Sequence, residues 1–325
     1  MNVGKSYRLR EFLVWTRREL YVLLAMAVAP VALYELSGWR FLAIPWTVVA
    51  LIGTATAFIV AFKNTQTYNR TAEAQQVWTS ILNASKSWGL MSRDFLKDGD
   101  ATRRLVNRHF AWLTALRYQL RRHRRWESTI GRTNAEYQAR YCVPEHEATL
   151  EAELGKYLSA DEVQTVLASR NKPTALMARQ SAALRELHAS GGIVINFFIE
   201  MEKALKELLD LQGRSERIKN FPYPRQYAII STIFIRSFCV LLPFGLLKDF
   251  AALGLVWLVV PFSVLVSWMY TSLEQVGAST ENPFEGGAND VPIAQIARMA
   301  EVEIREMLGD TDLPPLLRPK NNIIL

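Results

Sequence analysis

Long runs of apolar residues interrupt the otherwise mixed sequence of polar and hydrophobic positions. Residues 41–62 and 250–273 contain no Asp, Glu, Lys or Arg. A helix rises about 1.5 Å per residue, so about 20 such residues cross the hydrocarbon core of a bilayer. Two weaker runs, 20–34 and 227–247, flank them, the second with one charge at Arg236. The pattern predicts an all-α membrane protein with four transmembrane helices.

The segment between the second and third runs has helical periodicity. Apolar residues recur there at helical spacing, at Val77, Ile81, Trp88 and Phe95 and again at Phe110, Leu113, Leu116 and Leu120. This spacing indicates amphipathic helices that pack into a large helical body. We expect helix breaks near residues 98–100, Pro144, 159–161 and Pro173, with Ser159 capping the helix that follows it.

Two more helices are expected. One runs from about residue 192 to 219 and ends before Pro222 and Pro224, because the residue before a proline is biased away from helical geometry. The other covers residues 291–308, where apolar side chains form one stripe that must dock on another surface. The chain from Leu313 onward is interpreted as an extended strap lying on the body or on a neighbouring chain.

The elements predict four regions and one orientation. They are an N-terminal arm with the first two spans (1–80), a cytosolic helical region (81–225), the third and fourth spans (226–274), and a cytosolic C-terminal helix and tail (275–325). Lys and Arg precede the first span and populate the long segment after the second. Because cationic loops stay on the cytoplasmic side, we expect a multi-pass protein of the inner membrane with both termini in the cytoplasm.

Composition excludes several function classes. The net charge of +7 is carried largely by the cytoplasmic segment and does not require a nucleic acid partner. No Gly-rich phosphate loop, paired Cys motif or His pair at metal-ligand spacing occurs, and Cys142 and Cys239 are interpreted as structural. We therefore expect neither an enzyme nor a bound cofactor or metal. The basic run 121–125 is interpreted as an exposed helix face paired with acids.

The second span carries a distinctive pattern of small and bulky residues. Thr54, Phe58 and Phe62 are four residues apart and share one helix face. Copies of this helix around an axis would line a narrow hydrophobic pore, which can gate by dewetting. Alternatively the phenyl groups pack against lipid or the first span, which is the commoner use of such residues. A polar continuation without a helix breaker follows, so the span should extend into the body as one helix.

Arg236 is a charge in the middle of the third span. On insertion scales such a charge costs roughly 2.5–3.5 kcal/mol, so it indicates either an ion pathway or a buried partner. We favour a structural pair with a carboxylate or a helix C-terminus inside the bundle.

Taken together, these segments resemble the bestrophin family, including its bacterial members. The matching motifs, in chain order, are Phe62-Lys63-Asn64, Tyr68-x-Arg70, Glu73-Ala74, Glu216-Arg217-Ile218, Pro222-x-Pro224, Leu241 to Gly245, Glu281-Asn282-Pro283-Phe284 and Asn289-Asp290-Val291-Pro292-Ile293. Lys63 replaces the usual arginine of the first motif, and Thr71 and Ala72 replace a pair of tryptophans. The order and placement of the motifs relative to four spans cover most of the chain outside residues 90–190.

The resemblance implies a homopentamer in the bacterial inner membrane, with the second span of each subunit lining a neck and the cytosolic helices forming a vestibule. Its partners would be membrane lipid and the permeant ions, which the charged vestibule concentrates. The residues carried over are Thr54, Phe58 and Phe62 in the neck, Lys63 and Arg70 in the vestibule, and Ile193, Asn196 and Phe197 as candidates for a second, cytosolic constriction.

The resemblance also bears on calcium, which eukaryotic members bind through an acidic run after the Asn-Pro-Phe turn. The corresponding segment here, 285–290, offers too few carboxylates for the six to eight oxygens that calcium takes, so calcium gating is not expected.

The function expected from these features is passive ion conduction, with anions such as chloride favoured because phenyl ring edges carry partial positive charge. Two alternatives stay open, a cation-selective channel of the same architecture and a membrane scaffold or sensor that conducts nothing. An alternating-access carrier is disfavoured because no inverted repeat is present.

Overall fold

The computed structural model describes every residue except Ser6, and the described chain is helical, with two isolated β-bridges near its ends. It divides into two compact units. The span unit comprises residues 5–70 and 222–281. The helical body comprises residues 1–4, 71–221 and 282–325.

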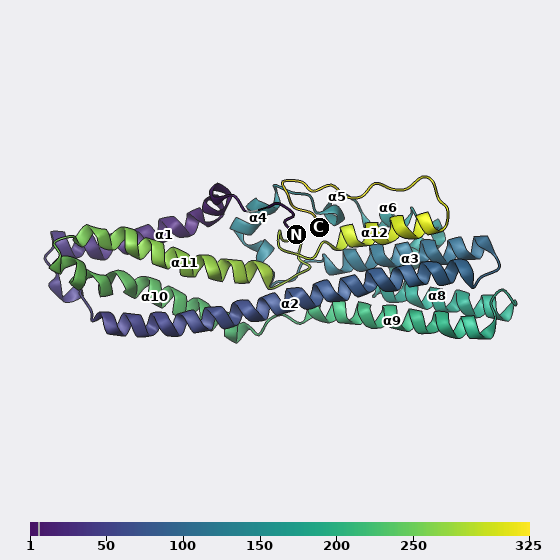
Figure 1. The fold of residues 1–325 in the computed structure, drawn as a ribbon, viewed down its shortest axis with the longest axis horizontal. Helices are drawn as coiled ribbons and strands as arrows, with labels where there is room; N and C mark the ends of the chain where they lie inside the picture. The colour runs from purple at the N-terminus through teal and green to yellow at the C-terminus, as the bar shows by residue number, and fades with distance from the viewer. Residues whose placement is uncertain (6) are drawn as a thin grey trace. The chain divides into compact units, whose positions relative to one another are not determined.

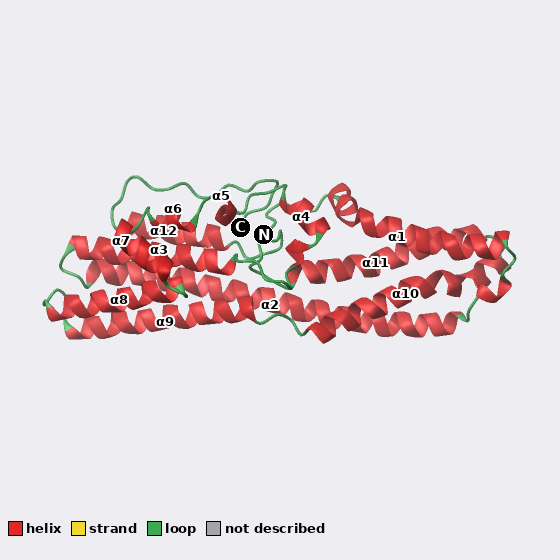
Figure 2. Cartoon of the chain, turned by 180° about the vertical axis from the view of Figure 1, so that it is seen from behind, coloured by secondary structure: helices red, strands yellow, loops and turns green. Residues whose placement is uncertain are grey.

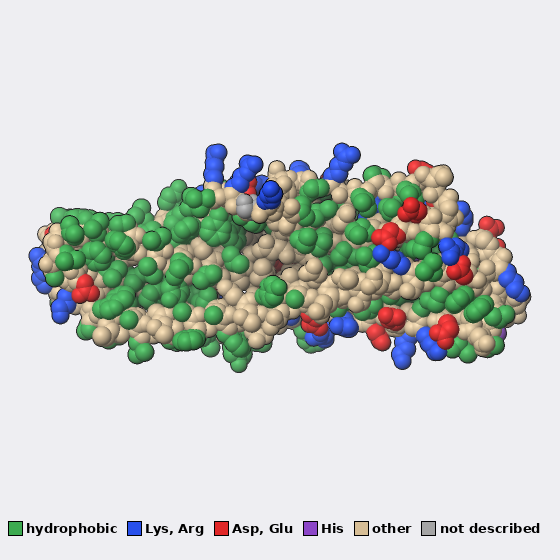
Figure 3. Space-filling model, in the orientation of Figure 1, with side chains coloured by type: hydrophobic (Ala, Val, Ile, Leu, Met, Phe, Trp, Pro, Cys, Tyr) green, Lys and Arg blue, Asp and Glu red, His purple; other side chains and the backbone are tan. Residues whose placement is uncertain are grey.

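Four long helices build the span unit. Its elements are α1 (Leu9–Leu36), η1 (Arg40–Leu42), the first part of α2 (Trp46–Asp94), α10 (Arg225–Ala252), η3 (Val256–Leu258) and α11 (Val259–Thr280). Helices α1, α10 and α11 pack on one another (Figures 1 and 2). Hydrophobic side chains cover the face over these helices (Figure 3). All four helices are long and apolar enough to cross a bilayer, and their number agrees with the four predicted spans.

The connections between spans differ from expectation. Helix α10 continues to Ala252, so the prediction that the fourth span begins at Phe250 is wrong. The helix is ended by Gly254, whose φ of 70° suits glycine, and the N–H of Leu255 closes the turn on the carbonyl of Phe250 at 2.9 Å. The second span also starts later than predicted, at Trp46.

Helix α2 runs unbroken for 49 residues from Trp46 to Asp94. This confirms that the second span extends beyond its apolar run as one helix. The polar residues after Phe62 contain neither proline nor glycine until Gly89, so no residue interrupts the backbone ladder.

The helical body is built on the remaining part of α2. Its further elements are α3 (Gly99–Leu120), η2 (Ser128–Ile130), α4 (Arg132–Gln138), α5 (Pro144–Glu147), α6 (Leu150–Leu154), α7 (Ala160–Ala168), α8 (Lys172–Ala189), α9 (Ile195–Asn220) and α12 (Ile293–Met307). The predicted helix breaks are confirmed, and the Ser159 side chain accepts a hydrogen bond from the N–H of Glu162. Trp78, Trp88 and Trp112 are fully buried in its core.

The amphipathic C-terminal helix docks as its stripe predicts. Ile293, Ala300 and Ile304 of α12 are buried in the helical body. After α12 the chain is extended, and its end returns to the helix, where the N–H of Gln295 donates to the carbonyl of Leu325 at 3.0 Å. The predicted strap therefore lies on the body of its own chain.

The interpretation of the basic run 121–125 as a helix face is wrong, and its first residue is not exposed. Helix α3 ends at Leu120, so the run leaves the helix, and Arg121 is 3% exposed. Its guanidinium lies 2.9 Å from Asp290 and 3.4 Å from Glu145, two buried carboxylates far away in sequence. A buried guanidinium needs such partners, because desolvating it alone is costly.

Candidate functional site

Helix α2 has a packed face and an exposed face within the span unit. Residues of the packed face recur every three or four positions and are buried: Val49, Gly53, Thr56, Val60, Lys63 and Thr67. This is the period of one helix stripe, so a single side of α2 contacts the other spans. The opposite side of the helix is left uncovered by the chain itself.

Two glycines fix the rotation of α2 in this packing. A Cβ atom on Gly245 of α10 would lie 2.7 Å from Cγ2 of Val49, and one on Gly53 would lie 2.7 Å from the ring of Phe238. Small residues of this kind let membrane helices approach closely. The hydroxyl of Tyr270 also donates to the carbonyl of Gly53 at 3.2 Å. The direction of the uncovered face therefore follows from how α2 packs.

The three residues expected in the neck lie together on the uncovered face. Phe58 is 74% exposed and Phe62 54% exposed, and Thr54 is exposed one turn before them. The hydroxyl of Thr54 donates to the carbonyl of Ala50 at 2.9 Å, which leaves its oxygen free to accept. Leu51 continues the same stripe and is 72% exposed.

The composition of this face differs from that of the other spans. The exposed faces of α1, α10 and α11 carry large apolar side chains, among them Val22, Leu24, Val28, Ile229, Ile233, Phe262, Leu265 and Met269. The uncovered face of α2 instead mixes Leu51 and its phenyl groups with Thr54, Ala55, Ala57, Ala61, Thr65 and Gln66. Hydroxyls and amides are disfavoured against lipid tails, and alanines permit close helix approach. The uncovered face of α2 is therefore less uniformly apolar than the exposed faces of the other spans.

The structure places Lys63 on a different face of α2 from the pore-facing one that the family resemblance implies. Its side chain lies on the packed face of α2 and is 4% exposed, so it does not share the face of Phe58 and Phe62. It lines a polar cavity of about 280 Å³ in the span unit, together with Glu19, Arg236, Glu274 and other polar residues. Helix periodicity explains the correction, because position 63 is in phase with the buried positions 56, 60 and 67.

Arg70 is half-buried and lies near a buried carboxylate at the end of α11. Burial raises the pKa of that carboxylate, Glu281, while Arg225 at 3.2 Å, Lys63 and Arg70 act in the opposite direction. The two basic residues expected in a vestibule thus take part in a charge cluster of the span unit.

Arg236 pairs with Glu19 of α1 through two hydrogen bonds, of 2.8 and 3.0 Å. The bidentate geometry matches a planar guanidinium to a carboxylate. Sequence reasoning anticipated a carboxylate partner for Arg236 but not which one. The available signal was Glu19 itself, an acid directly before the first apolar run.

The three candidates for a second constriction differ in how exposed they are in the helical body. Ile193 is 2% exposed and lies in the core. This burial corrects the expectation that its side chain faces a lumen. Asn196 is exposed, and Phe197 is 39% exposed with its ring stacked on Phe95 at 4.2 Å. Exposed apolar side chains at Val194, Ile195 and Ile199 accompany them. The exposed part of this segment is the first turn of α9.

The acidic residues after the Asn-Pro-Phe turn are already bound by protein donors. Asp290 accepts from Arg121 and from the N–H of Gly286 at 2.7 Å, and Glu285 accepts from Ser128. Burial and the neighbouring Asp290 raise the pKa of Glu285 to about 8. A guanidinium beside these carboxylates does not fit a calcium ion, which needs oxygen ligands on all sides. Among the described residues, no group of three or more His, Cys, Asp or Glu could hold a metal.

Comparisons with known proteins agree with this architecture. A family model described as bacterial/fungal bestrophin protein matches residues 13–306. The voltage-dependent anion channel-forming protein YneE of Salmonella typhi is 26% identical over 93% of this chain and 88% of its own length. Its counterpart in Escherichia coli K12 is 25% identical over 97% of this chain and 96% of its own length. The crystal structure of a bacterial bestrophin homolog from Klebsiella pneumoniae, solved by Zn-SAD phasing, has a TM-score of 0.76 with 24% identity, covering 91% of this chain and 99% of that one.

Proposed function

The chain belongs to the bacterial and fungal bestrophin family, and on this premise we propose that it is an ion channel that conducts anions passively along the uncovered face of α2. Relatives that match nearly the whole chain are named as voltage-dependent anion channel-forming proteins, which supports this class of function. The observation that carries the proposal is the stripe of Thr54, Phe58 and Phe62, which is exposed in the single chain although it lies in an apolar span.

A pore requires several copies, because one α2 helix cannot enclose a lumen. We propose a homopentamer in the bacterial inner membrane, with both termini cytoplasmic and the α2 helices around the axis. The alanines beside Phe58 support close contact between neighbouring α2 helices. Membrane lipid would then contact the large apolar side chains of the other spans.

In this assembly the phenyl groups form a narrow hydrophobic neck. Such a constriction excludes water when it is tight and conducts when it wets, so it serves as the gate. Ring edges of Phe58 and Phe62 carry partial positive charge and favour an anion, while Thr54 offers a hydroxyl one turn away. A second constriction would come from the exposed first turn of α9, with Asn196 and Phe197.

The buried position of Lys63 sharpens the question of selectivity. Because its ammonium is withdrawn from the uncovered face, anion preference rests on the phenyl edges rather than on a ring of lysines. This observation also keeps a cation-selective channel of the same architecture as the competing function. The sign of the reversal potential in a salt gradient separates the two.

The test uses the purified full-length assembly in planar bilayers. Phe58→Ala and Phe62→Ala should raise the open probability or the unitary conductance, because each removes a ring from the neck. Phe262→Ala is the matched control, since Phe262 is an exposed phenyl group of α11 that should face lipid.

Currents unchanged in both neck variants, or changed equally by the control, would contradict the neck. Native mass spectrometry that returned a monomer would contradict the pore itself, and a protein without currents would favour a scaffold.

A further inference from the structure

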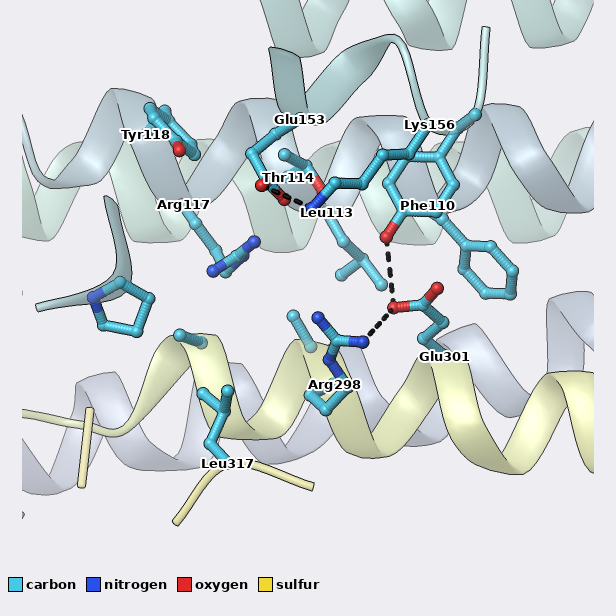
Figure 4. A pocket seen from close by; sticks show the side chains of 14 residues that line it. Phe110, Leu113, Thr114, Arg117, Tyr118, Glu153, Lys156, Arg298, Glu301 and Leu317 are labelled. Atoms are coloured by element: carbon cyan, nitrogen blue, oxygen red, sulfur yellow. Dashed lines mark hydrogen bonds and ion pairs between the residues drawn. The ribbon is translucent and has the colours of Figure 1, made fainter. Parts of the chain in front are cut away.

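A cavity in the helical body has none of the proposed pore residues in its lining. Its volume is about 130 Å³, and it is lined by α3, α12, the start of α5, the end of α6 with the segment after it, and the strap at Leu317 (Figure 4). All of these elements belong to the same unit. The cavity therefore joins the strap and the docked C-terminal helix to the core of the body.

Charged groups of both signs make up most of the polar lining. Arg117, Lys156 and Arg298 line the cavity together with two carboxylates, Glu153 and Glu301. Lys156 pairs with Glu153 at 2.5 Å, and Arg117 pairs with Glu145 outside the lining, so the formal charges of this group balance. In Figure 4 the guanidinium groups of Arg117 and Arg298 lie on either side of the space between α3 and α12. Guanidinium donors in a partly enclosed site can hold a carboxylate through charge-assisted hydrogen bonds.

The two arginines are incompletely matched by protein acceptors. Arg117 donates through Nη1 to Glu145 at 2.7 Å, but its buried Nε has no acceptor among the described residues. Arg298 lies 3.5 Å from Glu301, beyond a short charge-assisted hydrogen bond. Glu301 in turn accepts from Arg305 at 3.0 and 3.1 Å and from the hydroxyl of Tyr157 at 3.1 Å. Its charge is thus shared, and Arg298 retains donor capacity toward the cavity.

The remaining lining is apolar and sets the size of an occupant. Phe110, Leu113, Ala297 and Leu317 contribute hydrocarbon surface beside the charged groups. An engineered apolar cavity of about 150 Å³ holds benzene, so 130 Å³ suits about six non-hydrogen atoms. A four-carbon monocarboxylate has this size, with one charged end and one apolar end.

We infer that this cavity is a binding site for a short-chain monocarboxylate. Arg117 and Arg298 hold the carboxylate, and the hydrocarbon end packs on Phe110 and Leu317. Because the ligand contacts α3, α12 and the strap at once, its binding clamps the C-terminal segment onto the body. The site is independent of conduction and goes beyond the proposed channel function.

Binding is tested with butyrate on the intact detergent-solubilised assembly, by isothermal titration calorimetry and thermal unfolding. Butyrate should bind saturably and raise the unfolding temperature, and butylamine should do neither. Arg298→Gln removes a charge-assisted hydrogen bond and should weaken butyrate about 10- to 100-fold. Ala297→Leu keeps every charge but fills the cavity, and should abolish binding.

The control is Arg104→Gln, which removes an arginine from the exposed side of α3 and should leave butyrate binding unchanged. Absence of butyrate binding to the wild-type protein would overturn the site. So would equal binding of butylamine, or affinity retained in both Arg298→Gln and Ala297→Leu. Inorganic phosphate binding more tightly than butyrate would overturn the monocarboxylate class. None of these readouts depends on measured currents.

Discussion

Replacing Gly245 with alanine tests the packing that orients α2. The added Cβ would lie 2.7 Å from Cγ2 and 3.1 Å from Cβ of Val49, a fully buried residue. Valine is branched at Cβ and cannot swing that atom away, so the α2 backbone itself must move. Overpacking of this kind costs about 1–3 kcal/mol, and we expect the upper end here. Alanine recovers about 1 kcal/mol of helix propensity, so Gly245→Ala should destabilise the protein by about 2 kcal/mol.

The matched control is Gly213→Ala in the interior of α9. Nothing lies within 4 Å of a Cβ at Gly213, so only the propensity gain of about 1 kcal/mol should appear. Unfolding followed by tryptophan fluorescence in detergent should therefore separate the two variants by about 3 kcal/mol. Bilayer recordings of Gly245→Ala should also show altered gating, because the displaced α2 carries Phe58. Equal stability of the two alanine variants would refute the close-packing argument.

Three further outcomes are expected. Arg236→Gln should lower the free energy of unfolding by about 1–2 kcal/mol, between exposed and buried ion pairs, and adding Glu19→Gln should restore part of it in the double variant. Folding raises the pKa of Glu285 from 4.5 to about 8, so its contribution to stability is full below pH 4.5 and is lost as the pH rises through 8. Glu285→Gln should therefore flatten the stability–pH profile between pH 4.5 and 8. Ser159→Ala should cost about 1 kcal/mol in urea unfolding, because the cap of α7 is lost.

Local features of the fold were predictable from the sequence because they depend on neighbouring residues. The apolar runs identify the four spans, and the capping pattern at Ser159 places the start of α7. The shared face of Thr54, Phe58 and Phe62 follows directly from the helix period. The end of α10 was misplaced because Lys248 and Asp249 look like a loop, whereas Gly254 actually ends the helix.

Features that depend on distant partners were not predictable in the same way. The pairing of Arg236 with Glu19 joins residues 217 positions apart. The burial of Arg121 depends on Glu145 and Asp290, which the basic run gives no hint of. Lys63 is an intermediate case. Its helical phase with the buried Thr56 and Val60 predicts burial, whereas its charge and the family resemblance both predicted exposure.

The unbroken course of α2 also constrains how the gene can vary. Each residue of a helix turns the chain by about 100°, so deleting one residue between Phe62 and Trp78 would rotate the phenyl stripe relative to the buried tryptophan by that angle. An insertion of seven residues would keep the two within about 20° of their present phase. We therefore expect homologous genes to tolerate substitutions in this stretch but to conserve its length, making it a reliable anchor for aligning distant sequences.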